Sequence, residues 1–378
     1  MTRRERLMAT FRGSPVDRPP VSFYEIGGWR PDPDNSDPYN IYNAADWRPL
    51  LELAEAETDL IRMCGPERKP AADNPCEECF TNEAWEENGS RFSRNMVNVG
   101  GRKLTSLQRR DRNVATTWTL EHLLKDEDDV KAYLQLPDKV FHYEYDVKPL
   151  EEQQRDLGDA GVVMVDVDDP ICSVASLFSM EDYTVFAMTE PELFHRLLEK
   201  HALSRQAMTE EVARAFPGRL WRICGSEYAS EPYLPPHLYK EYVVRYTGPM
   251  VRAIQQHGGY ARIHSHGRLR NILPLIASMG AVGLDPVEPP PQGDVGLAEV
   301  RAEYGEQFVL FGNIESCELE SMESKAFEAR VKQAIKDGTA GRGRGFVLMP
   351  SSAPYGRTVS KETLANYETM VRMAKSYS

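Results

Sequence analysis

The second half of the chain alternates short apolar runs with longer amphipathic segments. The short runs are rich in β-branched residues, which is typical of buried strands: Gly161–Val167, Leu220–Cys224, Tyr260–His264, Ala281–Leu284, Gln307–Phe311 and Gly345–Met349. The longer segments have helical spacing: Pro191–Phe216, His237–His257, Leu269–Met279, Val295–Tyr304, Ser324–Lys336 and Lys361–Ala374. This alternation predicts a parallel sheet with right-handed helical crossovers.

Two earlier runs, Val21–Glu25 and Asp59–Met63, bring the predicted strands to eight. Eight strand–helix units close a barrel, so the fold class is predicted to be α/β, a (β/α)8 barrel with an N-terminal extension. One domain is expected to span residues 1–378. Residues 91–118 break the pattern and predict antiparallel hairpins that turn at Gly100 and Gly101. We expect this hairpin insertion to cover the barrel mouth.

Charge and composition narrow the possible functions. The 378 residues include 45 Lys and Arg against 58 Asp and Glu, a net charge of −13, which argues against nucleic acid and anionic membranes as partners. No apolar run is long enough to span a bilayer or to form a signal-peptide core. Cys76 and Cys79 have a metal-like spacing, but no second such pair completes a site. We therefore expect a cytoplasmic enzyme that acts on a small molecule.

Polar residues follow most of the predicted strands, where barrel enzymes carry their reacting groups. They are Glu25, Asp166, Asp168, Asp169, Glu227, His264, His266, Asp285, Glu288, Asn313, Glu315, Ser351 and Ser352. His264 and His266 are two residues apart and therefore share one strand face. Two imidazoles with Glu227 and Glu288 as oxygen ligands would suit zinc or another divalent ion. In the alternative interpretation, one histidine makes a hydrogen bond in the mouth and the other orients a loop.

Two further motifs have open interpretations. Crowding of Asp166, Asp168 and Asp169 would raise one pKa and make a general acid or base, or these residues cap the following helix. The segment Gly341–Gly345 is similar to a phosphate loop in composition only, because it lacks Lys-Ser/Thr and precedes a strand. The other histidines are expected to be structural: His122, His142, His195, His201, His237 and His257.

Several motifs together resemble the uroporphyrinogen decarboxylase superfamily. They are the start Arg3–Leu7 with Gly13–Val21, then His264–Gly267, Gly283–Glu288, Gly312–Ile314 and the closing helix Glu362–Met370. The set covers nearly the whole chain in order. The resemblance implies a (β/α)8 barrel, and it implies either a decarboxylase or a zinc-dependent methyltransferase that exchanges methyl groups with a corrinoid protein.

The motifs differ from both branches. Decarboxylases of the family hold substrate carboxylates with an arginine-rich segment, where this chain offers only Arg30, and where Glu25 would repel a polyacid. Asp59 matches their catalytic aspartate. The methyltransferases bind zinc through a His-x-Cys pair and a later Cys. Here His264 stands at the histidine and His266 at the first cysteine, and no cysteine lies within Met349–Ser352.

The resemblance favours methyl transfer from a methylated or methoxylated small molecule to the cob(I)alamin of a corrinoid protein. A divalent ion on His264, His266, Glu227 and Glu288 would polarise the substrate oxygen. Catalytic candidates are Asp166, Asp168, Glu25 and Asp59, and substrate-binding candidates are Tyr24, Trp29, Arg30, Asn313 and Tyr355. A decarboxylase or lyase of a small acid is the alternative, and a corrinoid- or tetrapyrrole-binding protein is a third hypothesis. A homodimer is the default assembly.

Overall fold

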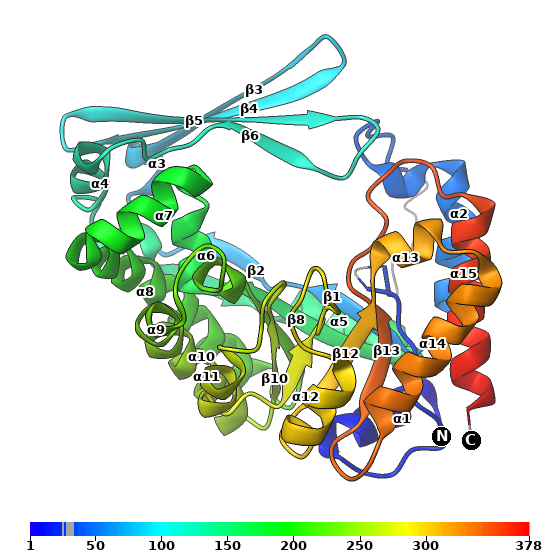
Figure 1. Ribbon diagram of the computed structural model, residues 1–378. Coiled ribbons are helices and arrows are strands. Elements are labelled where there is room, and N and C mark those ends of the chain that lie inside the picture. The colour runs from blue at the N-terminus through cyan, green and yellow to red at the C-terminus, as the bar shows by residue number, and fades with distance from the viewer. Residues whose placement is uncertain (25, 28–33, 378) are drawn as a thin grey trace.

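The computed structural model describes residues 1–24, 26–27 and 34–377, and its centre is a parallel sheet. The strand order is β1, β8, β9, β10, β11, β12, β13, so neighbouring strands follow one another along the chain. The strands are β1 (Leu60–Cys64), β8 (Gly161–Asp168), β9 (Leu220–Cys224), β10 (Tyr260–His264), β11 (Gly283–Asp285), β12 (Val309–Ile314) and β13 (Phe346–Pro350). The predicted (β/α)8-type barrel is confirmed (Figure 1).

The segment around Val21 joins the two edges of this sheet. Val21 pairs in parallel with Leu348 of β13, and its carbonyl accepts a hydrogen bond from the amide of Asp59 beside β1. The predicted strand Val21–Glu25 is reduced to this single bridge. Pro19 and Pro20 precede it without backbone N–H groups, and the chain turns at Tyr24. Glu25 itself lies outside the described residues.

The helices lie outside the sheet, with the exception of α1 (Figure 1). The α-helices are α1 (Arg3–Arg12), α2 (Arg48–Glu57), α3 (Cys76–Cys79), α4 (Glu127–Tyr133), α5 (Lys148–Leu157), α6 (Pro170–Ala175), α7 (Met180–Thr189), α8 (Pro191–Ala215), α9 (Pro236–Tyr239), α10 (Arg245–Gln256), α11 (Leu273–Ser278), α12 (Leu297–Tyr304), α13 (Ser316–Ser321), α14 (Ser324–Thr339) and α15 (Lys361–Ser376). Short 3-10 turns are η1 (Ile41–Asn43), η2 (Ala45–Trp47), η3 (Asp138–Phe141), η4 (Gly158–Ala160) and η5 (Ser226–Ala229). The predicted helix over residues 237–257 is interrupted by a π-turn, η6 (Lys240–Val244).

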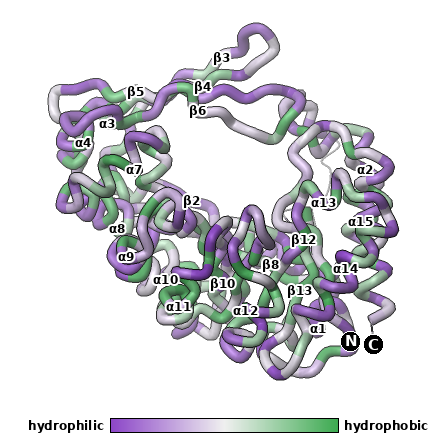
Figure 2. Tube along the Cα trace, in the orientation of Figure 1, coloured by the Kyte–Doolittle hydropathy of each residue, from purple (hydrophilic) through white to green (hydrophobic). Residues whose placement is uncertain are grey.

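An antiparallel sheet arches over one end of the barrel (Figure 1). It consists of β3 (Phe80–Glu87), β4 (Ser90–Val99), β5 (Arg102–Asp111) and β6 (Thr117–Glu121), and a ribbon of β2 (Glu67–Pro70) and β7 (Tyr143–Asp146) lies beside the barrel. The turn between β4 and β5 is at Gly100 and Gly101, as predicted. The sheet is larger than predicted, because strand β3 precedes the predicted hairpin segment over residues 91–118. Figure 2 shows that it is far more hydrophilic than the barrel strands.

Two apolar clusters hold the barrel together. The larger fills the space between strands and helices, and the smaller lies inside the barrel. Leu7 and Phe11 of α1 belong to the inner cluster, where the Phe11 ring contacts Phe311 at 6.0 Å between centroids. Helix α1, which begins with a capping box of Thr2 and Glu5, therefore closes the N-terminal end of the barrel. In the described part of the chain, no helix is long and apolar enough to cross a membrane.

Candidate active site

Strand register arranges polar side chains of the barrel interior in two layers near the C-terminal ends. The first layer aligns Asp166 with Arg222, and Arg222 with Arg262. The second aligns Asp168 with Cys224, Cys224 with His264, and His264 with Asp285. The same interior positions nearer the N-terminal end are apolar. The barrel interior thus changes from apolar to charged towards the mouth, where such enzymes act.

His264 is the most deeply buried histidine of the mouth, with 5% of the residue exposed. Its Nδ1 lies 2.8 Å from Oδ2 of Asp285, and Arg262 forms an ion pair with Oδ1 of the same carboxylate at 2.9 Å. Burial lowers the pKa of His264, and the Asp285 charge offsets this only in part. Arg262 and His264 outweigh burial and hold the pKa of Asp285 below its usual range. His264 is therefore neutral, with its Nε2 unprotonated when Nδ1–H donates to Asp285.

The surroundings of His266 shift its pKa in the opposite direction from that of His264. Its Nδ1 lies 2.7 Å from Oε1 of Glu288, whose Oε2 accepts a hydrogen bond from the amide of Gly267. Burial alone would lower the pKa of His266, but the hydrogen bond and charge of Glu288 outweigh it and raise the pKa. The two imidazoles meet edge to face with centroids 4.5 Å apart. One neutral and one readily protonated imidazole thus lie side by side, an arrangement typical of acid–base pairs.

The backbone before Glu288 is strained. Val287 has φ 54°, a conformation that costs a β-branched residue about 1–3 kcal/mol. Next to it, Gly312 of β12 has φ 144°, and a Cβ there would lie 2.2 Å from the carbonyl oxygen of Pro286. Only glycine permits this close approach of β12 to the Glu288 loop. The fold therefore holds Glu288 against His266 at a conformational cost.

Tyr24 and Arg222 border the histidines. The Tyr24 ring stacks on His264 with centroids 5.6 Å apart, and its hydroxyl accepts a hydrogen bond from Arg222. Arg222 also forms an ion pair with Asp166 at 2.6 Å. The predicted residues Tyr24 and Asp166 therefore lie in the same group as His264. Burial lowers the pKa of Arg222, and its carboxylate partner keeps the charge compensated.

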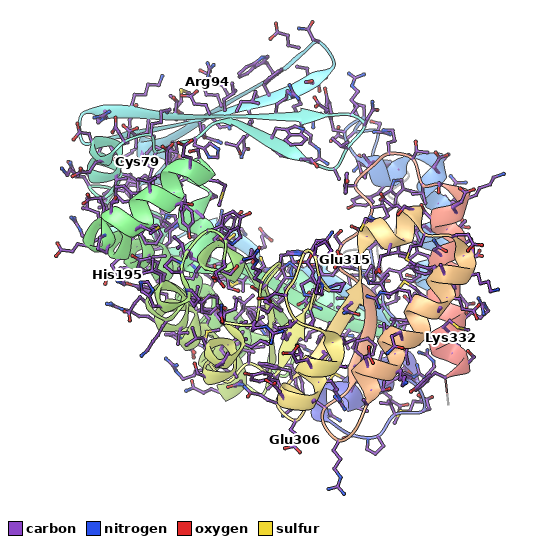
Figure 3. The ribbon with its side chains drawn as sticks, viewed as in Figure 1. Cys79, Arg94, His195, Glu306, Glu315 and Lys332 are labelled. Atoms are coloured by element: carbon purple, nitrogen blue, oxygen red, sulfur yellow. The ribbon has the colours of Figure 1, made fainter. Side chains whose placement is uncertain are left out.

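Two further carboxylates at the mouth keep unpartnered oxygens. Oε2 of Glu227 and Oε1 of Glu315 are buried without a hydrogen-bond partner among the described residues. Burial raises the pKa of Glu315 to about 7, and the nearby charge of Glu288 adds to the effect. Figure 3 shows Glu315 at the end of the barrel that faces the antiparallel sheet. Such unsatisfied groups at the end of a barrel are candidates for substrate contacts.

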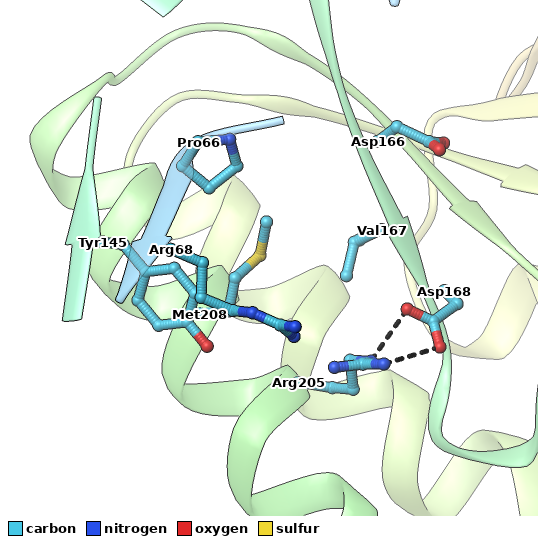
Figure 4. A pocket seen from close by; sticks show the side chains of 8 residues that line it. All are labelled: Pro66, Arg68, Tyr145, Asp166, Val167, Asp168, Arg205 and Met208. Atoms are coloured by element: carbon cyan, nitrogen blue, oxygen red, sulfur yellow. Dashed lines mark hydrogen bonds and ion pairs between the residues drawn. The ribbon is translucent and has the colours of Figure 1, made fainter. Parts of the chain in front are cut away.

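The aspartates at the end of β8 mostly make hydrogen bonds and ion pairs with other residues of the fold. Asp169 caps α6 by accepting from the amide of Cys172, so the capping interpretation is confirmed for this residue. Burial raises its pKa, and the charges of Glu227 and Asp168 add to the effect, in the direction that crowding predicts. Asp168 accepts from Ser173 and forms an ion pair with Arg205 at 2.8 Å. Asp166 and Asp168 line a cavity of about 220 Å³ together with Arg205 and Arg68 (Figure 4). Asp168 therefore faces this side cavity.

A complete metal site is not present in this arrangement. Nδ1 of each imidazole is hydrogen-bonded to a carboxylate, which is how metal-ligating histidines are usually oriented. Residues 1–24, 26–27 and 34–377, however, contain no group of three His, Cys, Asp or Glu side chains that could hold a metal ion. A catalytic zinc takes three protein ligands. The predicted set of His264, His266, Glu227 and Glu288 thus supplies part of a site and does not fit a preformed one.

Of the other predicted residues, Asp59 and Tyr355 lie away from this group, and Asn313 contacts the loop before Glu288. Asp59 precedes β1 at the opposite end of the barrel, where it is fully buried and paired with Arg6 and Arg18. Asn313 donates to the carbonyl of Val287, and its side-chain oxygen accepts from Arg330. Tyr355 is 58% exposed beside the antiparallel sheet. The candidates Glu25, Trp29 and Arg30 lie outside the described residues.

The sequence-based prediction of site residues omitted Arg222 and Arg262, and it gave Asp285 and Glu315 no role beyond their positions after strands. Arg262 shares its strand with His264 at a spacing of two, and Arg222 occupies the equivalent position in β9. This alternation was a usable signal, because residues two apart share a strand face. Asp285 and Glu315 follow strands and were considered only as strand-end residues. Their partners depend on strand register, which residue spacing does not give.

Comparisons with known proteins agree with this architecture. The model of the uroporphyrinogen decarboxylase (URO-D) family matches residues 119–377. No curated protein sequence matches the chain. A solved methyltransferase from Methanosarcina mazei is similar over 99% of this chain and 98% of its own, with 15% identity and a TM-score of 0.61. A putative vitamin-B12-independent methionine synthase from Listeria monocytogenes covers 60% of this chain and 69% of its own, with 14% identity and a TM-score of 0.39.

Proposed function

The chain belongs to the uroporphyrinogen decarboxylase family, and we propose that it transfers a methyl group from a methylated or methoxylated small molecule to a reduced corrinoid. The corrinoid is a second substrate, presented by a partner protein. The methyltransferase from Methanosarcina mazei, which shares the fold over its whole length, makes methyl transfer the starting hypothesis. The observation that carries the proposal is the pair of adjacent imidazoles, each held by its own carboxylate.

The pair supplies the proton that methyl transfer requires. When the methyl carbon–oxygen bond breaks, its electron pair stays on the oxygen of the leaving group. Nε2 of His266 donates a proton to that oxygen, and Glu288 stabilises the imidazolium before the transfer. His264 stays neutral beside it and accepts a hydrogen bond from the substrate through Nε2. Tyr24, which is 5% exposed, stacks on His264 and holds that ring in position.

The charges of the mouth favour a neutral substrate over a polyacid. Arg222, Arg262 and Arg205 are each paired with an aspartate of the chain. Glu227 and Glu288 are further carboxylates at the same end. A porphyrinogen with many carboxylates would meet repulsion here, whereas a methoxylated ring would not.

Zinc or another divalent ion remains a prediction, and no step above depends on it. His264 and His266 are the residues that would bind such an ion first. Metal analysis of the purified protein and of His264→Ala tests the prediction. A metal content that is undiminished in the variant contradicts a role of His264 as an essential ligand.

A methyl-transfer assay tests the proposed function. The purified protein is mixed with chemically reduced cob(I)alamin and a panel of methoxylated aromatic compounds and methylated amines. We expect the absorbance spectrum to change from cob(I)alamin to methylcobalamin with at least one donor, at a rate proportional to protein concentration. No methylation with any donor, together with release of CO2 from a small carboxylic acid, overturns the proposal.

A decarboxylase or lyase of a small acid is the second candidate. Nη1 and Nη2 of Arg262 have no hydrogen-bond partner among the described residues, and Arg262 is the cation beside His264 that a substrate carboxylate would have to reach, although the residue is only 1% exposed. Glu315, with its pKa raised to about 7 by burial, can protonate the carbon left by CO2. The same assay distinguishes the candidates, because CO2 release requires no methyl acceptor.

A further inference from the structure

A second cavity lies at the end of the barrel opposite the mouth. Its volume is about 470 Å³, and it is lined by residues 13–19, which follow α1, and by residues 341–346, which lead into β13. Both chain termini lie at this end (Figure 1). The cavity shares no lining residue with the imidazole pair, so the proposed function does not account for it.

The cavity concentrates positive charge in an acidic protein. Four arginines line it, Arg18, Arg301, Arg342 and Arg344, against one carboxylate, Asp17. The chain as a whole carries a net charge of −13. A local excess of cations in such a chain attracts anionic ligands, because the nearest charges dominate the field in a partly enclosed site.

The charges of these arginines are only partly neutralised. Arg18 is paired with Asp59, and Asp17 is paired with Arg6 at 2.6 Å. Arg301, with 6% exposed, donates to the carbonyls of Ala340 and Arg344, which satisfy N–H groups without cancelling a charge.

The remaining two arginines have no carboxylate partner among the described residues. Arg344 lines the cavity and donates one N–H to the carbonyl of Phe11 at 2.8 Å, which does not cancel its charge. Arg342 lines the cavity and is exposed. Two guanidinium charges at the cavity are therefore uncompensated.

The walls of the cavity are fixed and include an aromatic ring. A Cβ at Gly345 would lie 2.3 Å from Cγ2 of Thr10, so the loop packs tightly on α1. Tyr377, with 39% exposed, lines the cavity together with Phe346 and Val16. Guanidinium groups on one side and an exposed tyrosine ring on the other suit a ligand with an anionic group and a flat apolar group.

We propose that this cavity binds a phosphorylated small molecule with a flat ring, of the size of a mononucleotide. Arg342 and Arg344 hold the phosphate, with Arg301 behind them, and the ring lies against Tyr377. The volume falls within the range of about 300–1,000 Å³ that small-ligand sites occupy. Arginine side chains carry the recognition, so the absence of a P-loop motif in Gly341–Gly345 does not count against it.

Calorimetric titration of the full chain at constant ionic strength tests the proposal. The probes are AMP, inorganic phosphate and adenosine. We expect AMP to bind more tightly than phosphate, and adenosine to bind most weakly. Arg342→Ala should weaken AMP binding about tenfold or more, because it removes a charge-assisted contact. Ser14→Glu, which adds a negative charge to the cavity rim, should weaken AMP binding as well.

Arg214→Ala is the matched control, because it removes an exposed arginine on α8, outside the cavity. It should leave AMP affinity unchanged. Absence of AMP and phosphate binding at millimolar concentrations overturns the proposal. Equal weakening by Arg342→Ala and Arg214→Ala also overturns it, because binding would then follow net charge alone. Equal affinities for AMP and phosphate would contradict the ring contact with Tyr377.

Discussion

Buried carboxylates at the two ends of the barrel have different surroundings. At the N-terminal end, both oxygens of Asp59 are engaged by Arg6, by Arg18 and by the amide of Val21. At the mouth, Glu227 and Glu315 each keep a buried oxygen without a hydrogen-bond partner among the described residues. A fully satisfied carboxylate stabilises a fold, whereas an unsatisfied one costs stability and persists at sites of function. We therefore expect a structural role for Asp59 and substrate contacts for Glu227 and Glu315.

The histidine pair of the mouth gives the largest expected effect on rate. His266→Ala removes the proton donor and should lower kcat by about 10²–10⁴-fold, the usual contribution of a general acid. The free energy of unfolding should change by only about 1 kcal/mol, because 38% of the His266 side chain is exposed. Methylation of cob(I)alamin and urea denaturation measure the two quantities. A normal kcat in the variant would remove His266 from the mechanism.

Asp59 should show the reverse pattern. Asp59→Asn leaves Arg6 and Arg18 without their buried counter-charge and should lower the free energy of unfolding by about 3–5 kcal/mol. The rate per folded molecule should not change. Asp17→Asn is the control, because the Asp17 side chain is 43% exposed and its pairing with Arg6 contributes about 1 kcal/mol or less. A stable Asp59→Asn protein with a lost rate would instead assign Asp59 a catalytic role.

The smallest expected effect is on the pH dependence of the free energy of unfolding, and it comes from His201, which lies outside the candidate active site. Burial lowers the pKa of His201 to about 3, and its ring lies against Tyr133 and Phe141. Below about pH 6.5, His201 takes up a proton in the unfolded chain but not in the folded chain. The free energy of unfolding therefore has its full value above pH 6.5 and falls as the pH decreases towards 3. The slope is about 1.4 kcal/mol per pH unit.

His201→Phe tests this linkage. The variant keeps an aromatic ring and cannot take up a proton, so between pH 8 and pH 5 it should lose about 2 kcal/mol less stability than the parent chain. Thermal or urea denaturation at both pH values measures the difference. The values at pH 8 provide the internal control, since both proteins are neutral at this position there. Parallel pH profiles would contradict the assigned pKa shift.

Strand-end positions were predictable because a buried strand and its polar end can be read from local pattern. His264, His266, Glu288 and Asp166 were all placed at the mouth in this way, and the structure brings them together with Tyr24. Asp59 was selected by motif similarity alone. Its position before β1 puts it at the other end of the barrel, since a residue that precedes a parallel strand lies opposite the mouth. Whether it takes part in catalysis remains a prediction.

The sequence by itself determined the order of the later barrel strands and their helices, the barrel class and the pair of histidines two residues apart, because these follow from local periodicity and spacing. Only the tertiary structure decided which partners each group meets. Register sets Asp285 beside His264, and the strained loop at Val287 sets Glu288 against His266, which drives the two pKa values in opposite directions. The cavity lined by Arg18, Arg301, Arg342 and Arg344 likewise combines segments more than 300 residues apart. Such contacts depend on how distant strands and loops align, and no local pattern encodes that alignment.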